Sequence, residues 1–404
     1  MPDAASNSSS PDLTTSTIDP PADTPVPAEP RYGVRERDEI RWESPFEFTG
    51  DGAEYFRIWI VNLLLTLVTF GVYSAWAKVR KTRYFWQNTR LAGHVFDFHG
   101  RPAAILRGRI LALVLLLAYT WSFEFSLIAG TVTISVLCVL APWLFFKAQQ
   151  FRFYNTSHRG LRFGFPAKLG DAYRMALPLL LLWGGFIVSA STFTALDDKR
   201  FAAALMIFPV LIVVLLPSLH HRLKAFQHRN ATWGNQRFSF VSATAGFYKT
   251  YLKALAVAAV SMLAMIATGV GLALVLSHWH ANPATVGVVF GLLGSAIYIF
   301  LWPYMSVRLQ QVVWRHTLVE GVRFDTAIRV WPLVRLVART VALTIATAGL
   351  YWPFAAVALA RYRITSMRMS PSAPLASVVA VEDTRTRTAL GDAATDTFGF
   401  DIGL

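Results

Sequence analysis

The chain contains a single cysteine, Cys138, and few charged residues of either sign. One cysteine excludes a disulfide within the chain and the Cys-x-x-Cys pair of many zinc and redox sites. Charged residues make up 15% of the 404 positions, whereas hydrophobic residues make up 54%. A soluble domain needs more polar surface than this, so the composition indicates a protein that presents apolar side chains to lipid.

Carboxylates are scarcer than basic residues, with 24 Asp and Glu against 38 Lys and Arg. The long apolar stretches contain no Asp or Glu. Glu124, Asp197 and Asp198 fall in the short segments between the stretches. Proton-coupled transport normally depends on an ionisable relay at membrane depth. The absence of such carboxylates therefore argues against that mechanism.

Sequence motifs for cofactors or catalysis are also missing. The chain has no P-loop, no Gly-rich dinucleotide fingerprint after a strand, no HExxH and no GxSxG. His220-His221 and His278-x-His280 resemble fragments of a metal site, but neither pair has an evident third ligand. We therefore predict no cofactor, no metal site and no enzymatic activity, with solvated histidines as the simpler interpretation.

Apolar stretches of about 20 residues, the length that a helix needs to cross ~30 Å of hydrocarbon, recur along the chain. Six of them cover residues 107–123, 126–147, 174–196, 201–219, 252–276 and 286–307, and two more cover 55–77 and 335–360. Lipid-exposed backbone must be hydrogen-bonded within each helix, so the eight apolar segments predict an all-α polytopic membrane protein. Residues 1–44 and 370–404 are polar and predicted to be disordered, which leaves 45–369 as the membrane domain.

One sequence pattern recurs at fixed spacing. It has a proline or alanine, an Asn or His 13 residues later, and a Phe, usually in Phe-x-Phe, eight residues after that. Such self-similarity predicts one supersecondary unit used repeatedly, here a transmembrane helical hairpin. The copies start at Ala75, Pro142, Pro217 and Pro303, with a truncated copy at Pro353, and reach Asn88, Asn155, Asn230 and His316 before Phe96/Phe98, Phe163/Phe165, Phe238/Phe240 and Phe324.

The parts of this pattern predict local structure. Helical periodicity continues past each proline, and an amide side chain then ends the helix. A glycine follows, at Gly93, Gly160, Gly234 and Gly321, and permits a positive φ, while Phe-x-Phe predicts a short strand with both rings on one face. We expect the strands to pair into a small sheet. For the motif residues a structural role is the main interpretation, with ligand binding as the alternative; they are Asn88, Thr89, Asn155, Thr156, Asn230 and Thr317.

Lys and Arg cluster in the segments that carry the recurring pattern, whereas the intervening segments around Glu124 and His278 have none. The positive-inside rule therefore predicts that every copy of the pattern, strands included, is cytoplasmic. The formal charge of +14 is then a signal of orientation and of contact with membrane lipids through their anionic headgroups. We expect no nucleic acid as partner.

The two end segments differ from the six full spans. Phe46 to Ala75 and Phe324 to Pro353 are each 29 residues apart, and both contain Gly-x-Tyr just before the recurring pattern begins. A re-entrant hairpin broken at the glycine would keep both ends cytoplasmic, and a single span is the alternative. We predict that these elements meet and frame a candidate cavity or structural motif formed by Asn62, Thr66, Gly71, Tyr73, Trp76, Gly349 and Tyr351.

The first end segment carries a family resemblance. Residues 46–66 (FEFTGDGAEYFRIWIVNLLLT), 70–80 (FGVYSAWAKVR) and 83–89 (RYFWQNT) resemble the YjgN-like family of bacterial inner-membrane proteins. The resemblance covers most of 46–369 and implies a multi-pass protein of the bacterial inner membrane. It implies no activity and no functional residues, and the long terminal extensions depart from the family.

Two classes of function remain open from the sequence. A small-solute transporter or channel is favoured by broken elements at corresponding positions of the two ends. A non-transporting membrane scaffold or lipid-interacting protein is favoured by the lack of buried carboxylates and by the basic, aromatic loops. An enzyme is the third alternative. Gly287-x-x-x-Gly291 suits packing within the chain or between copies, so a homo-oligomer remains open.

Overall fold

The computed structural model describes residues 46–196, 199–278, 283–319 and 322–370. Most of these residues are helical, as expected for a polytopic membrane protein. The predicted terminal segments lie outside the described residues, apart from residue 370. Gly321 and His280 of the sequence predictions also lie outside them.

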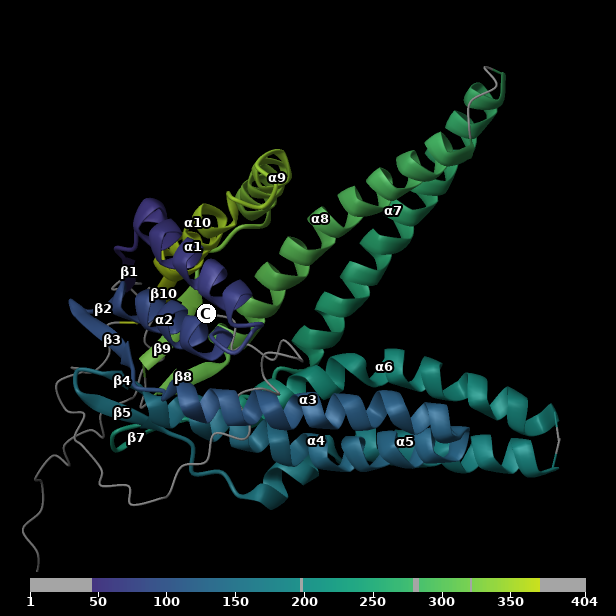
Figure 1. Ribbon diagram of the computed structural model, residues 1–404, viewed down its shortest axis with the longest axis horizontal. Coiled ribbons are helices and arrows are strands. Elements are labelled where there is room, and N and C mark those ends of the chain that lie inside the picture. The colour runs from purple at the N-terminus through teal and green to yellow at the C-terminus, as the bar shows by residue number, and fades with distance from the viewer. Residues whose placement is uncertain (1–45, 197–198, 279–282, 320–321, 371–404) are drawn as a thin grey trace, which may run out of the picture. The chain divides into compact units, whose positions relative to one another are not determined.

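In the described part of the chain, the elements follow one order five times: a strand, two helices and a second strand (Figure 1). The first segment contains β1 (Phe46–Phe48), α1 (Gly52–Val68), α2 (Ser74–Gln87) and β2 (Thr89–Leu91). The second contains β3 (His94–Phe98), α3 (Pro102–Phe125), α4 (Leu127–Asn155) and β4 (Thr156–His158). The third contains β5 (Leu161–Gly164), α5 (Leu169–Leu196), α6 (Lys199–Arg229) and β6 (Thr232–Trp233). The fourth contains β7 (Gln236–Phe240), α7 (Thr244–His278), α8 (Pro283–Arg315) and β8 (Thr317–Val319), and the fifth contains β9 (Val322–Thr326), α9 (Val330–Ala346), α10 (Trp352–Thr365) and β10 (Met367–Met369).

The strands of the described residues form one antiparallel sheet whose order follows the sequence from β1 to β10. Within each segment, the first strand pairs with the second across the two helices. The register is the same throughout, as in Phe46 opposite Leu91, Phe96 opposite His158 and Phe324 opposite Met369. The predicted Phe-x-Phe strands therefore belong to a sheet larger than the small one expected from the sequence.

Tight turns join one segment to the next. Ala92-Gly93 and Arg159-Gly160 have positive φ at both residues, 49° and 79° in the first turn and 53° and 76° in the second. This is the type I′ pattern, whose twist matches that of the flanking strands. Gly234, with φ of 56°, serves the same purpose between β6 and β7. The predicted positive φ is thus confirmed at the three glycines that the structure describes.

The Asn of the recurring pattern ends the second helix in the first three segments. The side-chain amide of Asn88 donates to the carbonyl of Tyr84 at 2.9 Å, and those of Asn155 and Asn230 donate to the carbonyls four residues earlier at 2.8 and 2.9 Å. His316 and Ser366 make the same i to i−4 contact at 2.7 and 2.6 Å. These side chains add hydrogen bonds at the carbonyl end of the helix, where backbone donors run out; the Tyr84 carbonyl also accepts from the backbone N–H of Asn88 at 3.1 Å. Thr89, Thr156 and Thr317 do the same for the next carbonyl, at 2.8, 2.9 and 2.8 Å.

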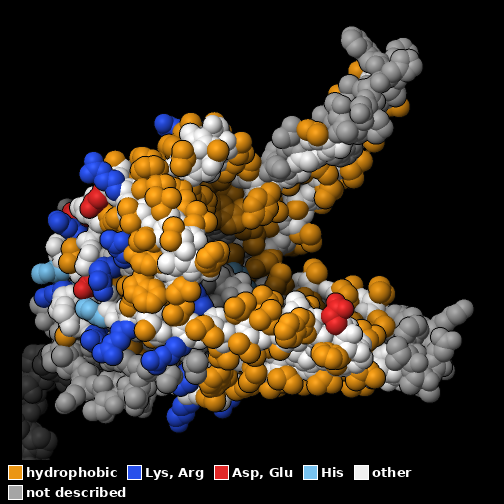
Figure 2. Space-filling view, in the orientation of Figure 1, with side chains coloured by type: hydrophobic (Ala, Val, Ile, Leu, Met, Phe, Trp, Pro, Cys, Tyr) orange, Lys and Arg blue, Asp and Glu red, His pale blue; other side chains and the backbone are white. Residues whose placement is uncertain are grey.

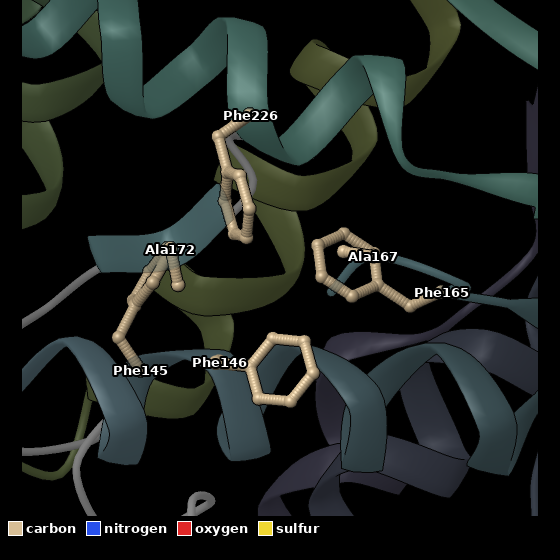
Figure 3. Close-up of a cluster of buried hydrophobic side chains, with 6 residues drawn as sticks. All are labelled: Phe145, Phe146, Phe165, Ala167, Ala172 and Phe226. Carbon is tan, nitrogen blue, oxygen red and sulfur yellow. The ribbon is translucent and has the colours of Figure 1, made fainter. Parts of the chain in front are cut away.

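Aromatic side chains fill the space between the sheet and the helices. Phe165, which follows β5, is fully buried and packs between rings of α4 and α6 (Figure 3). Its ring centroid lies 5.4 Å from that of Phe226 and 6.4 Å from that of Phe146. The residues that start the recurring pattern are buried too, namely Ala75, Pro142, Pro217, Pro303 and Pro353.

Five helices of the described residues are long and apolar enough to cross a membrane. Figure 2 shows apolar side chains over the helices, whereas Lys and Arg side chains gather around the strands. These helices lie at Pro102–Phe125, Leu127–Asn155, Leu169–Thr192, Leu205–Arg229 and Thr244–Leu272.

The last segment packs against the first. Each second helix contacts the first helix of the following segment, and α10 contacts both α1 and β1 in the same manner. The Arg361 guanidinium donates to the Gly50 carbonyl at 2.7 Å, and the Phe354 ring stacks on Phe56 at 5.7 Å. An equivalent hydrogen bond joins the fourth segment to the fifth: the Gln311 amide of α8 donates to the Ile328 carbonyl, which precedes α9, at 2.9 Å. The helix pairs thus form a closed circle of contacts.

Candidate functional site

The two end segments contain matching turns at the predicted glycines. Gly71 and Gly349 have φ of 89° and 94°, a conformation that favours glycine. In both turns a threonine hydroxyl accepts a hydrogen bond from the backbone N–H of the tyrosine of Gly-x-Tyr, at 2.9 Å for Tyr73 and 3.0 Å for Tyr351. The chain therefore reverses at the glycine in both segments, and the strands before and after each helix pair are hydrogen-bonded neighbours.

Three predicted site residues meet in the first of these helix pairs. Arg80 donates to the Tyr73 hydroxyl at 3.2 Å and to the Asn62 side-chain oxygen at 3.5 Å. Asn62 is buried, and the Thr66 hydroxyl bonds its backbone carbonyl at 2.6 Å. Trp76 stacks on Tyr73 at 6.2 Å and is exposed. Asn62, Thr66 and Tyr73 thus form a polar cluster with Arg80, a residue that the sequence prediction missed.

The predicted residues of the last segment have separate contacts. Tyr351 stacks on Phe354 at 5.5 Å, and Phe354 stacks on Phe56 of α1. Tyr351 therefore reaches the first segment through aromatic packing rather than through the cluster around Asn62, and Gly349 lies in the turn before it. The two end segments meet, as expected, but the structure does not join their predicted residues around a common polar cavity.

The turns of the end segments present apolar side chains. Phe70, beside Gly71, is 98% exposed, and Val68 and Ile345 are each 75% exposed. Exposed apolar tips on a chain with membrane-length helices are suited to lipid.

A polar helix face that the sequence analysis missed lies on the second helices. We define the inner face as the residues 3, 7 and 10 positions after each residue that starts the recurring pattern, a spacing that places them on one side of a helix. All are buried or half-buried, although ten of the fifteen are polar or basic. They are Lys78, Thr82 and Phe85; Phe145, Gln149 and Arg152; His220, Lys224 and Gln227; Ser306, Gln310 and Val313; and Ala356, Ala360 and Arg363.

Two glutamines of the inner face are fully buried. Gln149 of α4 is 0% exposed and Gln227 of α6 is 1% exposed. Neither the oxygen nor the nitrogen of either side-chain amide has a hydrogen-bond partner among the described residues. Buried amides are normally satisfied by protein or by ordered water, so these two glutamines are unusual positions in the described part of the fold.

The inner faces of different helices contact one another. Arg363 of α10 donates to the Ser306 hydroxyl of α8 at 2.9 Å, and its guanidinium lies over the Trp302 ring at 5.4 Å. The Gln310 amide lies 3.6 Å from the Met367 sulfur of β10. The sequence signal for this face was present, because Gln149 and Gln310 both stand seven residues after a proline of the recurring pattern.

The sheet carries a shallow pocket of about 430 Å³. His99 contacts the Ser157 hydroxyl at 2.8 Å, whereas its other ring nitrogen lies 3.7 Å from the Asp97 carboxylate. The second distance is too long for the hydrogen-bonded chain of a Ser-His-Asp triad, so we assign no catalysis here. The pocket is lined by His94, Val95, Asp97, His99, Ser157, Arg159, Gly160 and Arg162.

Membrane-length apolar helices and a sheet built from the segments between them define a multi-pass helical membrane protein. The chain belongs to the family described as bacterial protein of unknown function (DUF898), which matches residues 43–397. The match extends further toward the C-terminus than the resemblance seen in the sequence.

Three curated relatives are similar to parts of the chain. Inner membrane protein YjgN of Salmonella typhimurium is 32% identical over 144 residues, 35% of this chain and 36% of that protein. The YjgN proteins of Escherichia coli O157:H7 and K12 are 27% and 25% identical over 216 and 209 residues, which cover 50% and 48% of this chain and 53% and 51% of theirs. The chain thus spans between about a third and a half of the length of these relatives. No solved structure matches it. The YjgN-like resemblance is confirmed, and the chain is a multi-pass inner-membrane protein.

Proposed function

We propose that this protein is a small-solute channel or transporter whose path follows the inner face of the second helices. The observation that carries the proposal is the pair of fully buried glutamines, Gln149 and Gln227, whose amides have no hydrogen-bond partner among the described residues. Buried polar groups are costly unless they meet a hydrogen-bond partner or face a cavity. A solute path along these helices would give the two amides hydrogen-bond partners, namely water or the solute itself.

The circle of helix contacts supports this proposal. The apolar outer surfaces of α3 to α7 suit lipid, so a polar path has to run between helices. The second helices offer such a line because their inner faces are polar and because Arg363 and Ser306 join two of those faces. We place the path there rather than at the predicted cavity residues of the end segments.

For the architecture we propose six full spans and two short end hairpins, built from one repeated unit. The sixth span is α8, which has 33 residues. In the end pairs α1 and α9 have 17 residues each, and α2 and α10 have 14, so each pair enters the cytoplasmic leaflet and returns. The sheet and both termini are then cytoplasmic, as the charge distribution favours.

Site-directed cysteine labelling tests this topology in a Cys138→Ser background. A cysteine in place of Arg90, Arg159 or Arg323, all exposed at the sheet, should resist a membrane-impermeant maleimide in spheroplasts and react after permeabilisation. A cysteine at position 280 should react without permeabilisation. A reporter fused after residue 404 should be active on the cytoplasmic side, and a periplasmic reporter would contradict the returning end hairpin.

Solute flux tests the function itself. We expect proteoliposomes to swell in a panel of small neutral solutes and salts faster than protein-free liposomes, and Gln149→Leu with Gln227→Leu to abolish most of the increase. Leucine removes the polar groups but fills similar volume, and removing an unpaired buried amide should leave the fold as stable or more so. The melting temperature of the double variant is therefore measured as well: reduced flux with an unchanged melting temperature indicates loss of the path, whereas a lowered melting temperature indicates loss of the fold.

A matched control is Gln150→Leu on the neighbouring side of α4, where the amide oxygen lies 3.4 Å from Lys147. It should preserve flux. If the wild-type protein accelerates swelling in none of the solutes, the proposal is wrong. A lipid-interacting scaffold, with the basic residues around the sheet on anionic headgroups, is then the better account (Figure 2). Membrane lipids are the partners proposed in either case, a homo-oligomer is compatible with both, and nucleic acid is not proposed.

A further inference from the structure

We propose that the outer face of the sheet binds the acidic end of this chain's own C-terminal segment, residues 388–404, whether or not the protein transports a solute. The outer face is the side of the sheet opposite to the buried phenylalanines, and its positions alternate with theirs along each strand. Paired residues form five short rows across this face, and every row contains one arginine. The five are Arg90, Arg162, Arg237, Arg323 and Arg368.

These arginines are available to a ligand. All five are exposed, and within the described ranges none of their side chains has a hydrogen-bond or ion-pair partner. Two carboxylates of the same face already have donors, because Asp97 accepts from the Gln87 amide at 3.1 Å and Asp325 from Arg315 at 2.8 Å. The third, Glu47, lies on the edge strand β1. The outer face therefore has an excess of guanidinium groups that can bind carboxylates.

The chemistry of the outer face favours an acidic peptide over lipid or nucleic acid. The helices pack on the opposite side of the sheet, against Phe48, Phe98 and Phe240, so this face is turned away from the lipid around them. Single-stranded nucleic acid is usually held by aromatic rings on which its bases stack. In the described strands, no outer-face position carries Phe, Tyr or Trp. Carboxylates need only guanidinium groups, which bind them through two parallel hydrogen bonds.

The C-terminal segment has the charge that this surface requires. Residues 388–404, which lie outside the described residues, contain Asp392, Asp396 and Asp401 but no Lys or Arg. The chain enters this segment from β10, the strand that carries Arg368, so the segment and the sheet are on the same side of the membrane. Charge and position thus identify this chain's own segment as the occupant.

The length of the C-terminal segment also suits the outer face. Residues 371–391 can extend to about 70 Å, whereas the distance from β10 to β5 is about 24 Å at the usual strand spacing. Arg162 and Arg237 stand two strands apart, roughly 10 Å. Successive aspartates of an extended segment can lie about 13–17 Å apart, so a slightly slack segment can place one beside each arginine.

The contact should depend on salt concentration. Each exposed ion pair contributes little by itself. Because the segment is attached to the sheet through β10, its local concentration there is on the order of millimolar, and several pairs can form at once. The screening length falls from about 10 Å at 0.1 M salt to about 3 Å at 1 M, so high salt should release the segment.

Energy transfer within the full-length protein tests the inference. In a Cys138→Ser background, one fluorophore is attached at Ser239→Cys, an exposed outer-face position between Arg237 and Arg323. The other is attached at Thr395→Cys in the C-terminal segment. In phosphatidylcholine nanodiscs we expect transfer at about 0.1 M salt to fall several-fold at about 1 M.

Charge removal on either partner should have the same effect as salt. Neutralising the aspartates of the segment should lower the transfer at low salt to the value seen at high salt, with the variant Asp392→Asn, Asp396→Asn and Asp401→Asn. The same result is expected when three rows of the outer face lose their charge, with Arg162→Gln, Arg237→Gln and Arg323→Gln. The matched control removes three exposed arginines of α3, α6 and α8 and should leave transfer unchanged, with Arg107→Gln, Arg222→Gln and Arg308→Gln.

Three results would overturn the proposal. The first is transfer that does not respond to salt or to loss of the outer-face arginines. The second is transfer between molecules that each carry one fluorophore, because the segment then binds a second copy. The third is loss of transfer when phosphatidylglycerol is added to the nanodiscs, because anionic headgroups then occupy the outer face. If the triple arginine variant loses its melting transition, the aspartate variant gives the same measurement with the sheet unchanged.

Discussion

Replacement of Phe165 by alanine should destabilise the folded protein by about 3–5 kcal/mol, the usual cost of removing a buried aromatic ring. Phe165 is fully buried and contacts rings of α4 and α6 as well as Phe153, whose centroid is 5.2 Å away (Figure 3). The ring therefore connects the sheet to two helix pairs, and alanine would leave a cavity at their junction. Thermal or denaturant unfolding in detergent measures the change.

Phe163→Ala is the matched control. Phe163 belongs to the same Phe-x-Phe motif but is half-buried, stacked on Trp233 at 6.2 Å. Its replacement should cost clearly less than that of Phe165 because less apolar area is lost from the core. Equal losses for the two variants, or an unchanged transition for Phe165→Ala, would show that this junction does not hold the fold together.

Acid should weaken the fold through His158. Burial lowers the pKa of this histidine from 6.5 to about 4, and the nearby His94 and Arg159 disfavour its charge further. Its ring lies 4.5 Å from that of Phe96 and 5.1 Å from that of Trp233. The folded protein therefore keeps His158 neutral between pH 6.5 and pH 4, while the unfolded chain takes up the proton.

The direction of the effect follows from proton linkage. Above pH 6.5 both states are neutral at this site, so its contribution to stability is complete, and it falls as the pH drops toward 4, by up to about 3 kcal/mol. His158→Phe should flatten this part of the stability profile. Unfolding measured from pH 7.5 to 4 gives both profiles, and a wild-type profile that is flat over this range would contradict the assignment.

The recurring pattern predicted local structure well. Helix ends at Asn88, Asn155 and Asn230 were foreseeable because an amide side chain can bond the carbonyl four residues earlier. Strands at Phe-x-Phe and the chain reversals at Gly71 and Gly349 were foreseeable from local backbone chemistry. These features depend on residues close together in the sequence.

The long-range features were not predictable in the same way. Contact between α10 and α1 includes a hydrogen bond from Arg361 to the Gly50 backbone carbonyl, and every residue has such a carbonyl, so the sequence does not identify the acceptor. The inner face was missed, although Gln149 and Gln310 share their spacing from a proline, because its residues differ in type from helix to helix and belong to no known motif. The predicted cavity around Tyr351 stays a prediction, and the stacking of that ring on Phe354 was a contact that the sequence analysis did not predict.

The contact between the last and first segments also sets an order for biosynthesis. The core around Phe48 and Tyr55 of the first segment includes Val357 and Ile364 of α10. A ribosome delivers the N-terminal residues first, so each strand can pair with its neighbour soon after synthesis. The core of the first segment, by contrast, remains incomplete until nearly the whole membrane domain has been translated. The oldest part of the nascent chain is therefore among the last to acquire its final packing.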